Sequence, residues 1–442
     1  MEKKLKIGFA GNTNNYPYTL AIAFSKLGHD VKFLIDSTEK LHRPENRFIL
    51  ASKVFINTID LSPLSFNYWE ETDRDKIRKC RSFFADRDVI ILNSDFVSMS
   101  TEFNRPHIVL LTGSDLDFLA SEKYVEEFKN QIKKKFQTKY SNLWVYFAEK
   151  ISYCIPASTK YYLFYSNSML VKYVGLTILF KKVRKQMCLQ AEAIKRSPFL
   201  ISFPRGLNKS GELVLKKLKA TEKQRVFNLM TDVISVKNVP LVKHNNSVRI
   251  FNVARFNWHQ ATAPSTFTEM DFKGNDVMIN GIALFVKQFP NAQIEVVFVR
   301  KGENLKETYD LIRNLGLEAI ITWKDELSQA QVLEEYEKAD IVFDQFTTSL
   351  VGMGGLDALA VGRPLIANWR PEFFEQYEGK WPVCQATNVE EVFDWLKELV
   401  FNENRRIEIG KKGREFVEKK LSSEAFANRI LQALVLNKSL SN

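Results

Sequence analysis

The chain has 442 residues, of which 45% are hydrophobic and 26% charged, as is typical of a soluble globular protein. A chain of this length is too long for one ordinary hydrophobic core, so we expect two or three domains. The charged first residues run directly into a strand pattern, which argues against a signal peptide, and no window has the roughly 20 apolar residues that span a bilayer. The composition therefore predicts a cytoplasmic protein.

The cysteines and the charges narrow the class of protein further. None of the four cysteines has the spacing of a zinc site or a redox motif, which predicts a reducing compartment and no structural metal; they are Cys80, Cys154, Cys188 and Cys384. The net charge of +11 is local, because residues 123–200 carry 15 Lys and Arg against four Glu. The rest of the chain is electrically balanced.

Residues 1–238 begin with the βαβ pattern of a doubly wound parallel sheet. A helix is expected over residues 18–27, and strand patterns occur at 5–10, 31–35, 54–59, 88–92, 107–112, 199–203 and 226–230. The loop after the first strand has only Gly11 where a dinucleotide fingerprint has three glycines, so NAD binding is not expected. Ligands of such sheets lie beyond the carboxyl ends of the strands, which indicates the loops at 12–16 and 113–115.

Asp115, directly after the strand at 107–112, is a candidate catalytic carboxylate. It can instead cap a short helix together with Ser114. Asp115 and Asp117 also have the spacing of a metal-binding pair, although two short acids after a glycine are common. The sequence leaves these interpretations open.

Residues 123–196 form a basic helical insert in which lysines alternate with Phe, Tyr, Trp and Leu over several turns. One interpretation is contact with an anionic membrane surface, with aromatic rings at headgroup level and lysine stems along the apolar surface. A second is phosphate binding to nucleic acid, which we do not expect to be a partner. A third is a set of ordinary helices whose lysines are solvated.

An aperiodic run at residues 235–247 is the best candidate for a linker, and a new α/β pattern follows it. Strands are expected at 248–254, 294–299, 319–322, 341–343 and 365–367, helices at 278–288, 306–315 and 328–338, and a helical tail from 389 to 436. We therefore predict a second doubly wound domain at 248–420, and a C-terminal helix at 421–437 that returns to the first domain.

The strand at 341–343 leads into a glycine loop with Gly352, Gly354 and Gly355, and then into a helix expected from about Leu356 to Val361. Such a loop directs backbone N–H groups and the positive end of the helix dipole at an anion. Asp357 is expected in the first turn, where it can bind the hydroxyls of a ribose or merely offset the helix dipole.

Two basic residues of the second domain complete a diphosphate site in this interpretation. Arg255 ends the first strand and offers a planar fork, and Lys273, eighteen residues later, offers a point charge. The same pair can stabilise a departing diphosphate, so both residues are catalytic candidates. Taken alone, each is also typical of a solvated surface.

The second domain resembles that of retaining glycosyltransferases of the GT-B fold, in the group often called family 4. Four features carry the resemblance: Arg255, Lys273-Gly274, Asp344-Gln345, and the run from Gly352 through Asp357 to Pro364. The resemblance implies that Asp357 binds the nucleotide ribose, that the glycine loop holds diphosphate and sugar, and that Arg255 and Lys273 clamp the diphosphate. It also implies an α/β architecture of two Rossmann-like domains facing across a cleft, the first on the acceptor side. The insert at 123–196 is not explained by it.

Two positions depart from the pattern of this family. Ser349 stands where the family has a Glu that contacts the donor sugar, and Asp344 is a candidate substitute. The histidine of the N-terminal catalytic loop has no clear counterpart, because His107 lies at the start of its strand and not after its end. Backbone groups near Lys324 are candidates for reading the nucleotide base.

These features predict a glycosyltransferase that moves a sugar from a UDP- or GDP-sugar to a glycan or lipid-linked acceptor with retention of configuration. No cofactor or metal is required, because Arg255, Lys273 and backbone dipoles offset the diphosphate charge. If the insert at 123–196 binds lipid, the protein is peripheral on the inner face of the plasma membrane. The alternatives are a catalytically silent nucleotide-sugar-binding subunit and, as the weaker one, a sugar-nucleotide epimerase.

Overall fold

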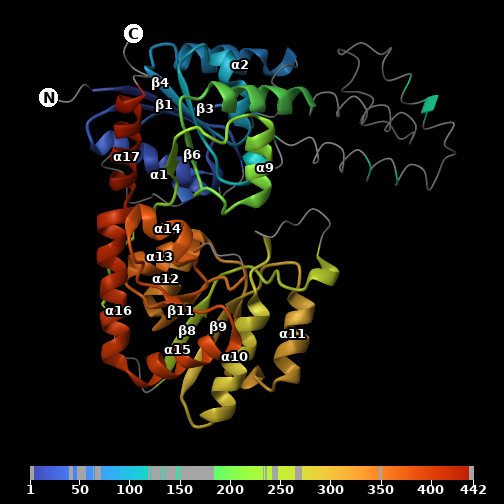
Figure 1. Ribbon diagram of the computed structural model, residues 1–442, viewed down its shortest axis with the longest axis vertical. Helices are drawn as coiled ribbons and strands as arrows, with labels where there is room; N and C mark the ends of the chain where they lie inside the picture. The colour runs from blue at the N-terminus through green and yellow to red at the C-terminus, as the bar shows by residue number, and fades with distance from the viewer. Residues whose placement is uncertain are drawn as a thin grey trace.

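The chain forms two α/β domains stacked along the long axis of the molecule (Figure 1). The computed structural model describes residues 4–38, 43–46, 56–62, 64, 71–117, 120, 130, 134, 146–147, 150, 184–231, 233, 236–240, 247–263, 271–347 and 351–437. Most of the predicted basic insert, and with it the predictions of membrane and nucleic-acid contact, lies outside the described residues.

The first domain is built on a seven-stranded sheet in the order β3-β2-β1-β4-β5-β6-β7, with parallel pairing throughout. The strands are β1 (Lys6–Ala10), β2 (Asp30–Ile35), β3 (Asn57–Asp60), β4 (Val89–Asn93), β5 (His107–Leu110), β6 (Leu200–Ser202) and β7 (Arg225–Phe227). The central strand β4 is buried along its whole length. Continuous apolar strands of this kind are typical of parallel sheets, because helices cover both faces.

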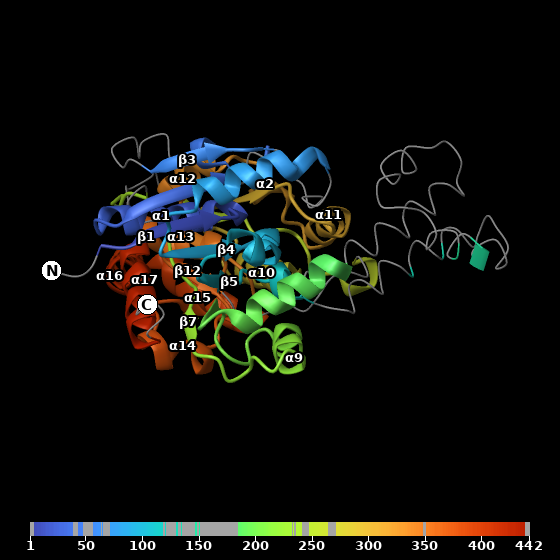
Figure 2. The same cartoon turned by 90° about the horizontal axis from the view of Figure 1, so that it is seen from above.

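Helices cover the two faces of this first sheet. They are α1 (Tyr16–Lys26), α2 (Glu71–Phe83), α3 (Ser100–Phe103), α4 (Ser114–Asp117), helical residues 184–196, and α9 (Lys209–Lys217). Helix α1 packs on one face, and α2, residues 184–196 and α9 pack on the other (Figure 2).

The second domain has a six-stranded parallel sheet in the order β10-β9-β8-β11-β12-β13. The strands are β8 (Val248–Asn252), β9 (Ile294–Val299), β10 (Ile321–Lys324), β11 (Ile341–Phe343), β12 (Leu365–Ala367) and β13 (Cys384–Gln385). The helices are α10 (Asn275–Gln288), α11 (Leu305–Asn314), α12 (Gln329–Lys338), α13 (Met353–Val361), α14 (Pro371–Glu378), α15 (Val389–Phe401) and α16 (Glu403–Phe416). Helices α12 and α13 cover one face, and α10, α11 and α15 the other.

The last helix, α17 (Ser423–Leu436), packs against α1 of the first domain, and Phe426 and Ile430 are buried in that domain's core (Figure 1). A π-helical turn, Val417–Leu421, precedes α17. Ser422 caps the start of α17 by accepting a hydrogen bond from the Ala425 N–H. The tail was predicted as helical throughout. The structure interrupts it at Asn402 and Ser422, because each side chain caps the helix that follows.

Candidate functional site

A cavity of about 590 Å³ lies between the two domains, beyond the carboxyl ends of both sheets. The first domain contributes loops after β1, β5 and β6, and the second contributes the ends of β8, β9 and β11 with the start of α13. The strand order reverses between β1 and β4 and between β8 and β11, which is where open α/β sheets bind ligands. The cavity brings together six of the residues predicted from the sequence: Arg255, Lys273, Asp344, Gly352, Gly354 and Asp357.

Helix α13 begins at Met353, three residues before the predicted Leu356, so Gly354 and Gly355 belong to its first turn. A Cβ on Gly354 would lie 2.8 Å from the Tyr336 hydroxyl, and one on Gly355 would lie 2.8 Å from a carboxylate oxygen of Asp344. Glycine is required here because the first turn lies directly against its neighbours. The early start puts the N–H groups of this turn, rather than those of a loop, at the cavity.

Asp357 was predicted in the first turn of α13. Because the helix begins earlier, Asp357 lies in its second turn. The residue is 9% exposed and lines the cavity, and its carboxylate accepts a hydrogen bond of 2.8 Å from the Thr231 hydroxyl. Thr231 in turn donates its backbone N–H to the Leu421 carbonyl at 2.9 Å. Asp357 is thus anchored to the two segments that connect the domains.

Asp344, which is buried, and Lys273, which is half-buried, are opposite charges on the cavity wall that influence each other electrostatically. Asp344 accepts a hydrogen bond from the N–H of Gly352, the N-cap of α13. Burial raises the pKa of Asp344 to about 6, while the Gly352 N–H and the Lys273 charge oppose this rise. Burial also lowers the pKa of Lys273, against the effect of Asp344 and Asp271.

The backbone of Lys273 is fixed on both sides by loops of the second sheet. Its N–H donates to the Asn257 carbonyl at 2.6 Å, and its carbonyl accepts from the Phe346 N–H at 2.6 Å. Asn257 is buried, and its side-chain oxygen accepts from the Glu303 N–H at 2.9 Å. Asn257 was not selected from the sequence, where only its place after a strand end, beside Arg255, marks it.

Asp115 does not line the interdomain cavity. Its buried carboxylate accepts hydrogen bonds from the N–H groups of Thr112 and Gly113 at 2.9–3.0 Å and from the Asn93 amide at 3.2 Å. Burial raises its pKa, and these donors oppose the rise. Asp115 thus holds in place Thr112 and Gly113, which do line the cavity. Both N–H groups precede α4, so these bonds fix the loop after β5 and differ from an N-cap, which accepts from N–H groups inside the helix.

Asn93 connects the two loops of the first domain and was also missed in the sequence. It donates to Asp115, and its side-chain oxygen accepts from the Thr13 N–H at 3.1 Å. A Cβ on Gly11 would lie 2.2 Å from the Asn93 carbonyl oxygen, so the two chains touch at this point.

A further predicted residue, Lys324, is not brought to the cavity. Lys324 lies at the end of β10, and its ammonium pairs with Glu335 at 3.0 Å. Ser349 lies outside the described residues. Within the described part of the chain, no helix is both long and apolar enough to cross a membrane, and no group of three or more metal-binding side chains gathers around a common point.

No family model and no curated protein matches this chain. Its structure is similar to that of sucrose-phosphate synthase from Thermosynechococcus elongatus, with 13% identity over 100% of both chains and a TM-score of 0.55. It is also similar to Anabaena HepE in complex with UDP and glucose, with 13% identity over 98% of this chain and 99% of that one and a TM-score of 0.56. HepE in complex with UDP-glucose gives 12% identity, coverage of 98% and 100%, and a TM-score of 0.53.

These similarities define the fold. The chain has the α/β architecture of the GT-B glycosyltransferases, with two Rossmann-like domains facing across a cleft. The predicted GT-B fold is therefore confirmed, and the narrower resemblance to family 4 stays a prediction.

Proposed function

We propose that the protein is a glycosyltransferase that takes its sugar from a nucleoside-diphosphate sugar. One observation carries this proposal: a single interdomain cavity is lined by Arg255, Lys273, the glycine turn that starts α13, and Asp357. Cations and helix N-terminal amides bind diphosphates, and a buried carboxylate binds ribose hydroxyls. The presence of UDP and UDP-glucose in the HepE structures supports a nucleotide sugar as the donor.

In the proposed reaction, the diphosphate lies at the N-terminus of α13 between Arg255 and Lys273. As the bond to the sugar breaks, negative charge grows on the leaving diphosphate, and these cations stabilise it. Lys273 is held by loops of the second sheet, so little reorganisation is needed during the reaction. We propose that the cations supply the counter-charge without a metal, and that the sugar keeps its configuration, as the resemblance to family 4 implies.

The acceptor is proposed to enter from the first domain, past Asn14, Thr112 and Gly113. Closure of the two domains would then exclude the water that hydrolyses the donor. We propose a glycan or lipid-linked acceptor and a cytoplasmic protein that is peripheral on the inner membrane face. The membrane contact depends on residues 123–196, and high-salt extraction of the native protein from vesicles of anionic lipid tests it.

The proposed activity is tested by incubating the protein with radiolabelled UDP- and GDP-sugars in the presence of EDTA. Slow release of free sugar is the expected result, because a transferase without acceptor passes sugar to water. An isomerised nucleotide sugar would instead indicate the epimerase. Binding without any turnover, with or without added metal, would indicate the catalytically silent subunit.

Replacing Asp357 with Ala is expected to weaken UDP binding by about 10- to 100-fold, the loss typical of hydrogen bonds to a charged group. Isothermal calorimetry measures this loss directly. Thr231→Val is the matched control, because it removes the hydrogen bond to Asp357 and keeps the carboxylate. An equal loss of affinity in Thr231→Val would show that Asp357 acts only by supporting the structure.

The affinity for a UDP-sugar is expected to rise as the pH falls from 8 towards about 6 and to level off below that. The pKa of Asp344 is already raised to about 6, and a diphosphate bound nearby would raise it further. Binding then takes up a proton at Asp344, so the affinity changes by at most about tenfold per pH unit. Asp344→Asn should flatten this dependence in calorimetry between pH 5 and 8. A wild-type affinity that is constant over this range would contradict a diphosphate beside Asp344.

A further inference from the structure

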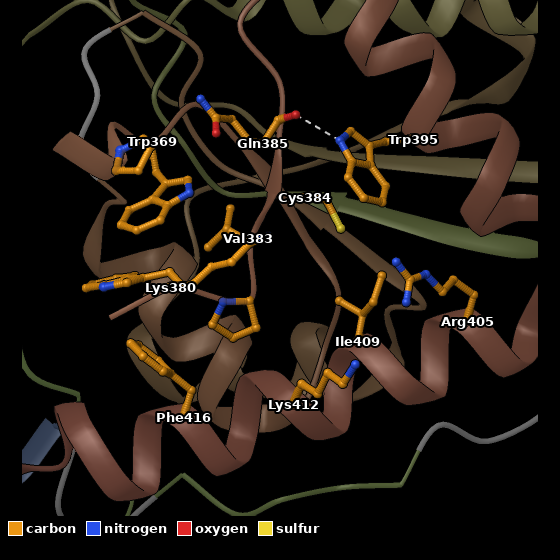
Figure 3. Close-up of a pocket in the computed structure, with 13 residues that line it drawn as sticks. Trp369, Lys380, Val383, Cys384, Gln385, Trp395, Arg405, Ile409, Lys412 and Phe416 are labelled. Atoms are coloured by element: carbon orange, nitrogen blue, oxygen red, sulfur yellow. Dashed lines mark hydrogen bonds between the residues drawn. The ribbon is translucent and has the colours of Figure 1, made fainter. Parts of the chain in front are cut away.

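A second cavity, of about 630 Å³, lies at the outer edge of the second sheet, beside its last strand β13 (Figure 3). Its walls come from the segment between α14 and β13, from α15, and from α16. It shares no lining residue with the interdomain cavity. The donor site proposed above therefore does not account for it.

Aromatic side chains form rigid walls of this edge cavity. Trp369 and Trp381 are stacked with ring centroids 5.0 Å apart, and Trp381 contacts Phe416 at 5.2 Å. Trp395 donates its indole N–H to the Gln385 carbonyl at 2.8 Å, which fixes the plane of its ring. Figure 3 shows Trp395 and Phe416 at opposite ends of the group of lining residues. Such preformed apolar walls are typical of a ligand site.

One buried polar group in this wall has no partner. The Trp381 side chain is 2% exposed, and its indole N–H finds no acceptor among the residues that the structure describes. Buried donors are almost always hydrogen-bonded, because an unsatisfied one costs about 1–3 kcal/mol. The nitrogen is itself buried, so an oxygen in the cavity can reach it only if the neighbouring side chains move.

The charged residues at the cavity indicate which charge its ligand carries. Three cations line it, Lys380, Arg405 and Lys412, and no lining residue carries a carboxylate. Two of these cations are paired with acids: Glu398 pairs with Arg405 at 2.7 Å, and Glu408 pairs with Arg405 and Lys412 at 2.9 and 2.6 Å. The acids position Arg405 and Lys412, and three cations against two acids leave a net positive charge of one.

We propose that the edge cavity binds an acidic sugar unit of a glycan, outside the donor site. The apolar face of the sugar ring would lie against the Phe416 ring, which follows Lys412 by one helical turn on α16. The carboxylate of the sugar would bind Lys412 and its neighbouring cations. The choice of a glycan rests on the proposed transferase function, since such a site would hold the growing chain while its end reacts in the cleft.

Tryptophan fluorescence reports on this site, because three of the seven tryptophans line it. The full-length protein is titrated with trigalacturonate, with uncharged maltotriose, and with benzoate. Saturable quenching by trigalacturonate alone, weakened by added salt, is the expected result. No quenching by trigalacturonate, or equal quenching by maltotriose or benzoate, would overturn the acidic-sugar assignment.

Two adjacent lysines of α16 provide a matched pair of variants. Lys412 lines the cavity and pairs with Glu408, whereas Lys411 lies outside it and pairs with Glu415 at 3.8 Å. Lys412→Ala should weaken trigalacturonate binding by about tenfold and Lys411→Ala should not. Equal affinities in the two variants would contradict the site.

The two proposals fail separately in this design. Hydrolysis of a UDP-sugar is measured in the same variants and should be unchanged, since neither lysine is near the interdomain cavity. If the wild-type protein hydrolyses the donor normally but does not bind trigalacturonate, only the edge site is rejected. Normal trigalacturonate binding without donor hydrolysis would reject only the proposed transferase.

Discussion

Replacing Lys273 with Met is expected to lower the rates of sugar transfer and of UDP-sugar hydrolysis by about 100- to 1,000-fold. This is the range seen when an enzyme loses one hydrogen-bond donor that stabilises growing negative charge. Methionine keeps most of the volume of this half-buried side chain and removes its charge. Backbone hydrogen bonds on both sides hold Lys273 in place at the cavity. Steady-state kinetics with a UDP-sugar measure kcat and KM for the variant.

Lys287→Met is the control for this variant. Lys287 is exposed in the last turn of α10, the helix that begins beside Lys273, so it makes the same change in net charge far from the cavity. Its rate should match that of the wild type. If Lys273→Met keeps its kcat and loses only affinity, then Lys273 binds the donor equally before and during the reaction and is not catalytic.

The strands that could be predicted from the sequence are those buried on both faces. Strands β9, β11 and β12 have the predicted bounds, because a continuous apolar run between polar turns has few alternative structures. Strand β13 was not predicted, since its two residues, Cys384 and Gln385, carry no pattern. It exists only because β12 offers an edge for pairing.

In the candidate site, too, features that depend on neighbouring residues in the sequence could be predicted, and features that depend on distant residues could not. The glycine turn of α13 was found because its backbone requirement is visible in consecutive residues. The roles of Asn93 and Asn257 depend on partners 80 and 46 residues away, the N–H groups of Thr13 and Glu303. Isolated asparagines carry no signal of such contacts. Asp115 was ambiguous for the same reason, because its donors on Thr112 and Gly113 are local but its burial is not.

Replacing Gly410 with Ala is expected to lower the free energy of unfolding by about 3 kcal/mol, the upper part of the usual range for overpacking. A Cβ at this position of α16 would lie 2.2 Å from the carbonyl oxygen of Gly362, the residue that ends α13. Backbone cannot rotate away as a flexible side chain can, so α16 must move relative to α13. Thermal unfolding followed by circular dichroism should show a fall in Tm of roughly 10 °C for a domain of this size.

The sign of this effect separates two opposing contributions at Gly410. In an exposed helix, a change from Gly to Ala stabilises by about 1 kcal/mol, because alanine is the better helix former. Only the close approach of Gly362 can reverse that gain. Lys411→Ala, at the exposed neighbouring position, should change the stability by no more than about 0.5 kcal/mol. A Gly410→Ala variant with a higher Tm than the wild type would therefore show that α16 and α13 are not in tight contact. In that case UDP binding at the start of α13 should be the same in the variant and the wild type.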